Sequence, residues 1–99
     1  MPISRLRHLH RKVVSDDNLY RRAIDDRLRV NPRDPDALFA RAALLASEHR
    51  NKEAIKSLND LAKVAPHYPG LWRFKAQLYQ DMGETKLASL CQEKGDASP

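Results

Sequence analysis

The sequence predicts an all-α protein in which about six antiparallel helices pair into three stacked helical hairpins. Three observations lead to this prediction: a sequence similarity that recurs at a fixed offset, apolar residues at helical spacing, and prolines at the expected helix boundaries. The chain has 99 residues, which suits one small domain. We expect this single domain to span residues 1–94, and residues 95–99 to form a short disordered tail.

The repeat is clearest where two prolines recur. The pattern V-x-P-x-x-P occupies residues 30–35 and again residues 64–69, and the same offset superposes Ala42 on Ala76. Because proline lacks a backbone N–H and clashes with the preceding turn, the first proline of each pattern ends a helix. The second proline suits the first turn of the next helix. The offset therefore divides the chain into hairpins of about residues 1–34, 35–68 and 69–94.

The first hairpin is predicted to pair helices over residues 3–14 and 17–30. Asp16 or Asp17 is a suitable N-cap for the second helix, because an aspartate side chain can accept the free backbone N–H groups of the first turn. The apolar residues of this helix recur with the period of an amphipathic helix.

The second hairpin is predicted to pair helices over residues 36–48 and 52–64. Leu38, Ala42 and Leu45 stand at positions i, i+4 and i+7, which places them on one face of the first helix. The connection between the two helices is only a few residues long, so the helices must run antiparallel.

The third hairpin is predicted to pair helices over residues 70–81 and 85–93. Gly83 follows the first of these helices and suits the left-handed conformation that commonly ends a helix. We expect Trp72 to be largely buried between the helices of its own hairpin and the hairpin before it. A single hairpin cannot bury its apolar stripe, whereas three stacked hairpins form a continuous core.

These residues resemble the tetratricopeptide repeat, a helical hairpin whose units follow one another at this same period, with the signature W-x2-L-G-x2-Y, A-x3-F and a closing proline. Residues 72–79 read W-x2-K-A-x2-Y and are followed by Ala88, while residues 38–45 read L-x2-R-A-x2-L. Residues 54–58 then read A-x3-L, and Pro66 is the closing proline. The resemblance covers about residues 35–92 and implies a short right-handed α-solenoid.

Two departures from the family pattern stand out. The leucine before the small residue is replaced by Arg41 in one unit and by Lys75 in the next. Gln92 stands where the family has an aromatic residue, so the last hairpin is expected to be short, with an outer face that serves as a cap. The small residues of the signature are expected to let paired helices approach closely; they are Ala42, Ala54, Ala76 and Ala88.

The resemblance implies a protein–protein interaction module that binds a peptide or a partner helix in a concave groove lined by the first helices. The family's groove positions carry over to Phe39, Ala43, Ala46, Arg73, Gln77 and Gln80. Phe39 is either an exposed anchor for the partner or a side chain packed against the N-terminal hairpin or the other helix. These residues favour a segment with one buried apolar side chain and one acidic group.

The net charge of +5 is concentrated near the N-terminus, where Arg5, Arg7, Arg11 and Lys12 occur before any acidic residue. The charges suit a solvated helix face, an anionic partner such as nucleic acid or an acidic protein surface, or an organellar presequence. Binding of nucleic acid is the less favoured alternative, because few aromatic residues accompany these charges. A self-assembly element is another alternative, since a short solenoid has two open ends.

Catalytic and metal-binding motifs are not evident in the sequence. Cys91 is the only cysteine, so neither a disulfide framework nor a four-cysteine zinc site can form. Without an adjacent base it is predicted to be a small buried residue rather than a nucleophile. We therefore expect no enzyme activity, no cofactor, no metal and no membrane span. The expectation is a cytoplasmic monomer or weak homo-oligomer.

Overall fold

In the computed structural model, residues 18–97 are described. Throughout this range the chain is helical with short turns and has no strand, so the all-α prediction is confirmed for the described residues. The predicted count of six helices is not met, because the described residues form five and the predicted helix over residues 3–14 lies outside them. These five are helix 18–30, α2 (Pro35–Ser47), α3 (Asn51–Val64), α4 (Leu71–Asp81) and α5 (Thr85–Ala97).

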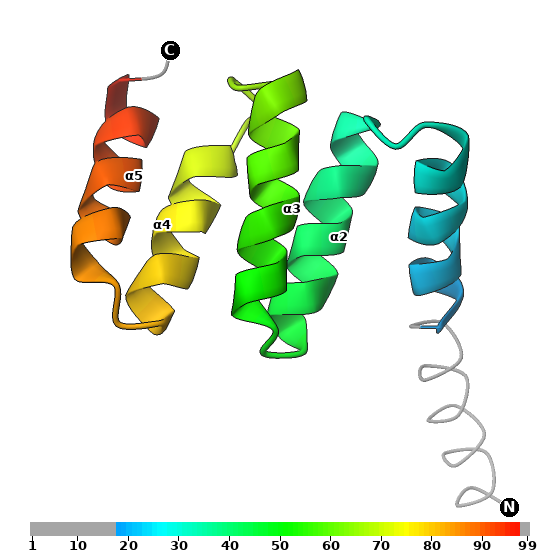
Figure 1. Cartoon of the computed structure of the whole chain (residues 1–99), viewed down its shortest axis with the longest axis horizontal. Helices are drawn as coiled ribbons and strands as arrows, with labels where there is room; N and C mark the ends of the chain where they lie inside the picture. The colour runs from blue at the N-terminus through cyan, green and yellow to red at the C-terminus, as the bar shows by residue number, and fades with distance from the viewer. Residues whose placement is uncertain (1–17, 98–99) are drawn as a thin grey trace, which may run out of the picture.

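The helices stand in a single row, and each runs antiparallel to the one before it (Figure 1). The most extensive helix contacts join α2 to α3 and α4 to α5, and a smaller contact joins α3 to α4. Helix 18–30 and α5 lie at opposite ends of the row (Figure 1). The described chain therefore contains the two predicted hairpins α2–α3 and α4–α5, packed one against the other.

The turns inside these two hairpins have the same backbone geometry at equivalent positions of the repeat. His49 adopts a φ of 61° and Gly83 a φ of 77°, both in the left-handed region. The sequence predicted this conformation at Gly83 but not at His49, whose β-carbon disfavours it. Equivalent hydrogen bonds close the turns: Arg50 N–H donates to Leu45 O at 2.9 Å, and Glu84 N–H donates to Tyr79 O at 2.8 Å.

The connections into the two hairpins also correspond at the offset of the repeat. Each preceding helix ends with a hydrogen bond to a carbonyl one helical turn earlier, and a second bond tightens the loop that follows. The bonds run from Asn31 N–H to Arg27 O (2.8 Å) and from Asp34 N–H to Asn31 O (3.0 Å), and again from Ala65 N–H to Leu61 O (2.7 Å) and from Tyr68 N–H to Ala65 O (3.0 Å). The repeat seen in the sequence is thus repeated in the backbone of the described residues.

The starts of α2 and α4 differ. Asp34 caps α2, because its carboxylate accepts the Ala37 N–H at 3.1 Å. At the start of α4, Gly70 takes a φ of 83° and no side chain caps the helix.

The core lies along the contact surfaces between helices. The four small residues of the repeat are buried, as predicted, which lets the paired helices approach closely. Leu58, Leu61 and Leu71 are the largest fully buried side chains of the described residues. The small residues are Ala42, Ala54, Ala76 and Ala88, at most 5% exposed.

Trp72 packs against the core cluster, which agrees with its predicted burial, although it is not among the fully buried side chains. Its side chain is half-buried, and the indole N–H donates to the Pro66 carbonyl at 2.9 Å. The ammonium groups of Lys75 and Lys94 lie 5.1 Å and 4.8 Å from its ring. Leu71, the first residue of α4, is the fully buried side chain of this segment.

The last helix is longer than the sequence predicted. α5 continues to Ala97, so residues 95–97 are helical where a disordered tail was expected. Gly95 in this last turn lies beside the start of α4, where a β-carbon would lie 3.4 Å from Trp72 Cβ. The sequence prediction ended the helix before Gly95 because glycine is unfavourable in a helix interior.

Candidate functional site

Three aromatic rings join the two hairpins near the predicted groove. The ring of Phe39, on α2, lies 5.1 Å from the ring of Tyr68 and 5.6 Å from the ring of Phe74, measured between centroids. Phe39 is half-buried by these contacts. It therefore packs against the end of its own hairpin and against the following one, and it keeps part of its surface exposed.

A hydrogen bond fixes one ring of this aromatic cluster. The Tyr68 hydroxyl donates to Asp36 Oδ1 at 2.6 Å, and this bond to a carboxylate raises the pKa of Tyr68. The sequence reasoning did not single out Tyr68 or Phe74. A signal was present, however, because half of the six aromatic residues fall within residues 68–74.

The predicted groove residues of α2 share one edge of that helix. Phe39, Ala43 and Ala46 stand at i, i+4 and i+7, so they follow one another along the same face. Ala43 is exposed, and Ala46 is half-buried. Together they make a narrow strip of small apolar surface beside the aromatic cluster.

The predicted groove residues of α4 line a different hollow. Arg73, Gln77 and Gln80 are exposed and border a depression of about 490 Å³ between α4 and α5, which we call the outer hollow. The α5 side of the outer hollow is also polar, and the buried Ala76 and Ala88 lie within it. The α5 side contributes Ser89, Gln92 and Glu93.

The six predicted residues are therefore brought together only in part. Arg73 lies between the two sets, because it also borders a second depression of about 310 Å³ whose lining includes Tyr68 and Gly70. Its guanidinium has no hydrogen bond or ion pair within the described part of the chain. The Gln77 amide, by contrast, donates to Asp81 Oδ1 at 3.0 Å.

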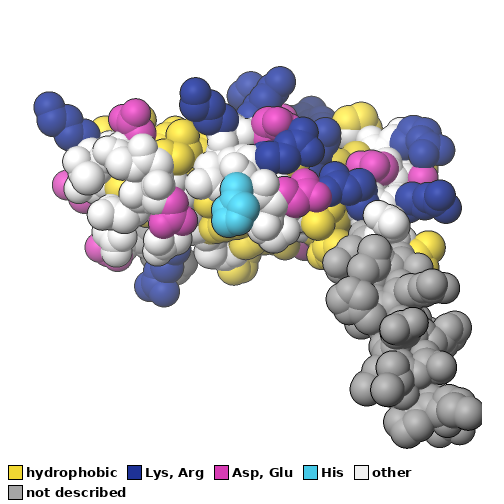
Figure 2. Space-filling model, turned by 90° about the horizontal axis from the view of Figure 1, so that it is seen from below, with side chains coloured by type: hydrophobic (Ala, Val, Ile, Leu, Met, Phe, Trp, Pro, Cys, Tyr) yellow, Lys and Arg dark blue, Asp and Glu magenta, His cyan; other side chains and the backbone are white. Residues whose placement is uncertain are grey.

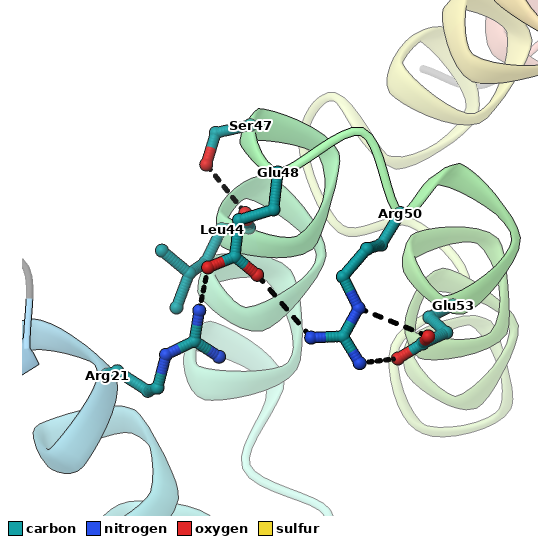
Figure 3. Close-up of polar contacts among 6 residues, drawn as sticks. All are labelled: Arg21, Leu44, Ser47, Glu48, Arg50 and Glu53. Atoms are coloured by element: carbon teal, nitrogen blue, oxygen red, sulfur yellow. Dashed lines mark hydrogen bonds and ion pairs between the residues drawn. The ribbon is translucent and has the colours of Figure 1, made fainter.

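A chain of ion pairs connects helix 18–30 to the α2–α3 turn (Figure 3). Glu48 accepts from Arg21 of helix 18–30 and also lies 3.6 Å from the Arg50 guanidinium. Arg50 in turn donates from Nε to Glu53 at 3.1 Å. The hydrogen bond from Arg21 holds the pKa of Glu48 below its usual value. Arg21 and Arg50 are therefore largely neutralised by carboxylates of the same chain.

Other arginines of the basic N-terminal hairpin are paired as well. Arg27 lies 2.9 Å from an Asp34 carboxylate oxygen, and Arg29 lies 2.7 Å from Asp26. On the face drawn in Figure 2, Lys and Arg side chains are interspersed with Asp and Glu rather than gathered into one patch. The predicted anionic-partner patch, Arg5, Arg7, Arg11 and Lys12, lies outside the described residues.

Cys91 is buried, as the sequence predicted. Burial raises the pKa of its thiol, which disfavours the reactive thiolate. Among residues 18–97, no three His, Cys, Asp or Glu side chains lie close enough together to hold a metal ion. None of the helices in this same range has both the length and the apolar character needed to cross a membrane.

Comparisons with known proteins add no identification. No protein-family model, no curated protein and no solved structure matches the chain. The resemblance to the tetratricopeptide repeat therefore depends on the sequence residues quoted above. The fold and the side-chain geometry carry the functional argument.

Proposed function

We propose that the chain is a protein–protein interaction module that binds a peptide or a partner helix along the exposed edge of α2 and α4. The proposal includes the architecture: a short right-handed solenoid of stacked hairpins similar to the tetratricopeptide repeat. The recurrence of equivalent backbone hydrogen bonds at the offset of the repeat supports this architecture. Such solenoids use an extended concave surface for binding.

The observation that carries the proposal is the exposed Arg73, unpaired among the described residues, beside the half-buried aromatic cluster. Arg21, Arg27 and Arg50 are held by carboxylates of the chain, whereas Arg73 is available to donate to a carboxylate of a partner. The strip of Ala43 and Ala46 offers close approach without polar side-chain groups to desolvate. A partner with one apolar side chain next to the aromatic cluster and one acidic group next to Arg73 fits this surface.

The test compares the removal of one positive charge from each of two faces. Arg73→Ala removes a positive charge from the proposed surface, and Lys56→Ala removes one from an exposed position of α3. The partner is first captured from native extract and identified, and its affinity is then measured by calorimetry. We expect Arg73→Ala to weaken binding by about 2 kcal/mol, whereas Lys56→Ala leaves binding nearly unchanged.

Equal affinities for the two variants would contradict the proposed surface. Both positions are exposed, so neither variant is expected to change the melting temperature by more than about 2 °C. A Gln77→Ala variant serves as a second probe of the same surface, although part of its effect passes through the hydrogen bond to Asp81.

Binding of an anionic partner through the N-terminal hairpin receives less support. Three arginines of that hairpin, Arg21, Arg27 and Arg29, are each paired with a carboxylate of the same chain. If nucleic acid were the partner, affinity would fall steeply with salt because bound phosphates release counterions. Self-assembly through an open end of the row is distinguished by sedimentation over a range of concentrations. We place the proposed module in the cytoplasm, since its single thiol is typical of a reducing compartment.

A further inference from the structure

At the offset of the repeat, the outer hollow between α4 and α5 corresponds to a surface of α2 and α3 that includes Ile55 and Leu58, which are buried with residues of α4. Each residue that lines the outer hollow has a counterpart one repeat earlier in the sequence, and these counterparts lie on α2 and α3, the helices of the preceding hairpin. The turns and connections of the two hairpins have equivalent hydrogen bonds, so the two surfaces have the same backbone framework. The outer face of α4–α5, here called the outer seat, is therefore shaped to receive a further helix.

The side chains of the two seats differ. In the α2–α3 seat, Ile55 and Leu58 are buried in a core cluster that also contains Leu71 and Leu78 of α4. In the outer seat their counterparts are Ser89 and Gln92, and both are exposed. Three other pairs also change from apolar to polar: Phe39 corresponds to Arg73, Ala43 to Gln77 and Ala46 to Gln80. Asn59 and its counterpart Glu93 are both polar and exposed. Only the two small residues are kept, with Ala42 and Ala54 corresponding to Ala76 and Ala88.

An apolar helix packed on such a lining would bury the Ser89 hydroxyl and the Gln92 amide without partners, because their counterparts Ile55 and Leu58 are buried in the α2–α3 seat. Each buried polar group without a hydrogen bond costs on the order of 1–3 kcal/mol, so a few of them cancel the gain from apolar contact. The small alanines at the centre of the seat allow a helix to approach, but the polar rim penalises one that brings only apolar side chains.

We propose that Ser89 and Gln92 determine what the outer seat can bind, by rejecting an apolar helix of the α4 type. A second copy of this chain, or another hairpin with the same sequence, is thereby prevented from extending the row. A helix that brings hydrogen-bonding groups to the glutamines and a carboxylate to Arg73 is not penalised in this way. This inference goes beyond the proposed function, because it holds whether or not the α2–α4 edge binds a partner.

The test adds one more hairpin to the full chain. A second copy of residues 64–97 is fused directly after Ala97, which preserves the period of the repeat. The fusion is made on the parent chain and on a Ser89→Ile/Gln92→Leu variant, whose two changes restore the residues of the α2–α3 seat. Both positions are exposed, so the changes leave the core intact. A matched control carries Ser47→Ile and Lys56→Leu, two exposed positions on the α2–α3 hairpin.

Circular dichroism then measures helicity per residue and the melting temperature of each fusion. On the Ser89→Ile/Gln92→Leu variant, the added hairpin should fold. It should raise the melting temperature by roughly 5 °C or more over the same variant without the fusion. On the parent and control chains, the added hairpin should lower the helicity per residue and leave the melting temperature within about 2 °C. The proposal would be overturned if the fusion raised the melting temperature of the parent chain. It would also be overturned if the fusion failed to raise that of the Ser89→Ile/Gln92→Leu variant. The outcome is independent of the Arg73→Ala binding test, because Ser89 and Gln92 lie outside the proposed α2–α4 edge.

Discussion

At the scale of single residues, Phe39 shows how position in a repeat does not settle the role of a side chain. Its place on the first helix predicts a groove residue, and its ring nevertheless packs on Tyr68 at the end of its own hairpin and on Phe74 of the next. The reason is that aromatic rings gain free energy by burying area against one another. Phe39 is thus both a part of the candidate surface and a link between hairpins.

Replacing Phe39 by Ala should therefore destabilise the protein. Loss of a half-buried ring and of two aromatic contacts should lower the free energy of unfolding by about 2 kcal/mol, less than for a fully buried phenylalanine. Urea denaturation measures the change, and Phe39→Leu, which keeps most of the apolar volume, should recover about half of it. If Phe39→Ala unfolds at the same urea concentration as the parent, the ring does not hold the hairpins together.

At the scale of helices and turns, most of the predicted helix bounds came from the period of the repeat. It placed α2, α3 and α4 almost at their observed bounds, because prolines and apolar spacing act locally. The end of α5 was missed, because glycine is unfavourable in a helix interior and the packing of Gly95 beside Trp72 is a contact between distant residues. The aromatic cluster was missed for the same reason: Phe39 and Phe74 meet only when hairpins pack.

The two hairpin turns allow a comparison of two residue types in the same left-handed backbone conformation. His49 and Gly83 occupy the same place with nearly the same φ, but only glycine adopts it without steric cost. His49→Gly should raise the free energy of unfolding by about 0.5 kcal/mol, the relief of strain being partly offset by the greater freedom of glycine in the unfolded chain. Gly83→Ala should lower it by about 1 kcal/mol through the backbone alone, because an added β-carbon would meet nothing within 4 Å.

Urea midpoints measured on both variants test this pair. Opposite signs are expected, since each variant moves its turn toward the chemistry of the other. Changes of the same sign would mean that the two turns are not equivalent in the folded protein.

At the scale of the whole molecule, helix 18–30 is joined to the rest of the row by few apolar contacts and by ion pairs. Ile24 is its only buried side chain, and Leu28 is partly buried against the core cluster. Arg21 pairs with Glu48 and Arg27 with Asp34, so each half of the helix has an electrostatic link to the α2–α3 hairpin or its N-cap. The row of helices is therefore most sensitive to solution conditions at its N-terminal end.

Acid should loosen this end of the row first. The pKa of Asp34 is lowered, chiefly by the Ala37 N–H that it accepts, and the pKa of Glu48 is lowered, chiefly by the hydrogen bond from Arg21. A lowered folded-state pKa means that the stabilisation is complete above the unfolded values, near 3.8 for Asp34 and 4.5 for Glu48, and is lost as pH falls through the folded-state values. Melting temperature should thus fall as pH decreases below about 5, and hydrogen exchange should accelerate in helix 18–30 before it does in α3.

The Glu48→Gln variant should melt at a lower temperature than the parent at neutral pH. Its melting temperature should also decline less steeply in acid, because it has one ionisable link fewer to lose. Parallel declines for the two chains would show that the Arg21–Glu48 pair does not hold the N-terminal end of the row.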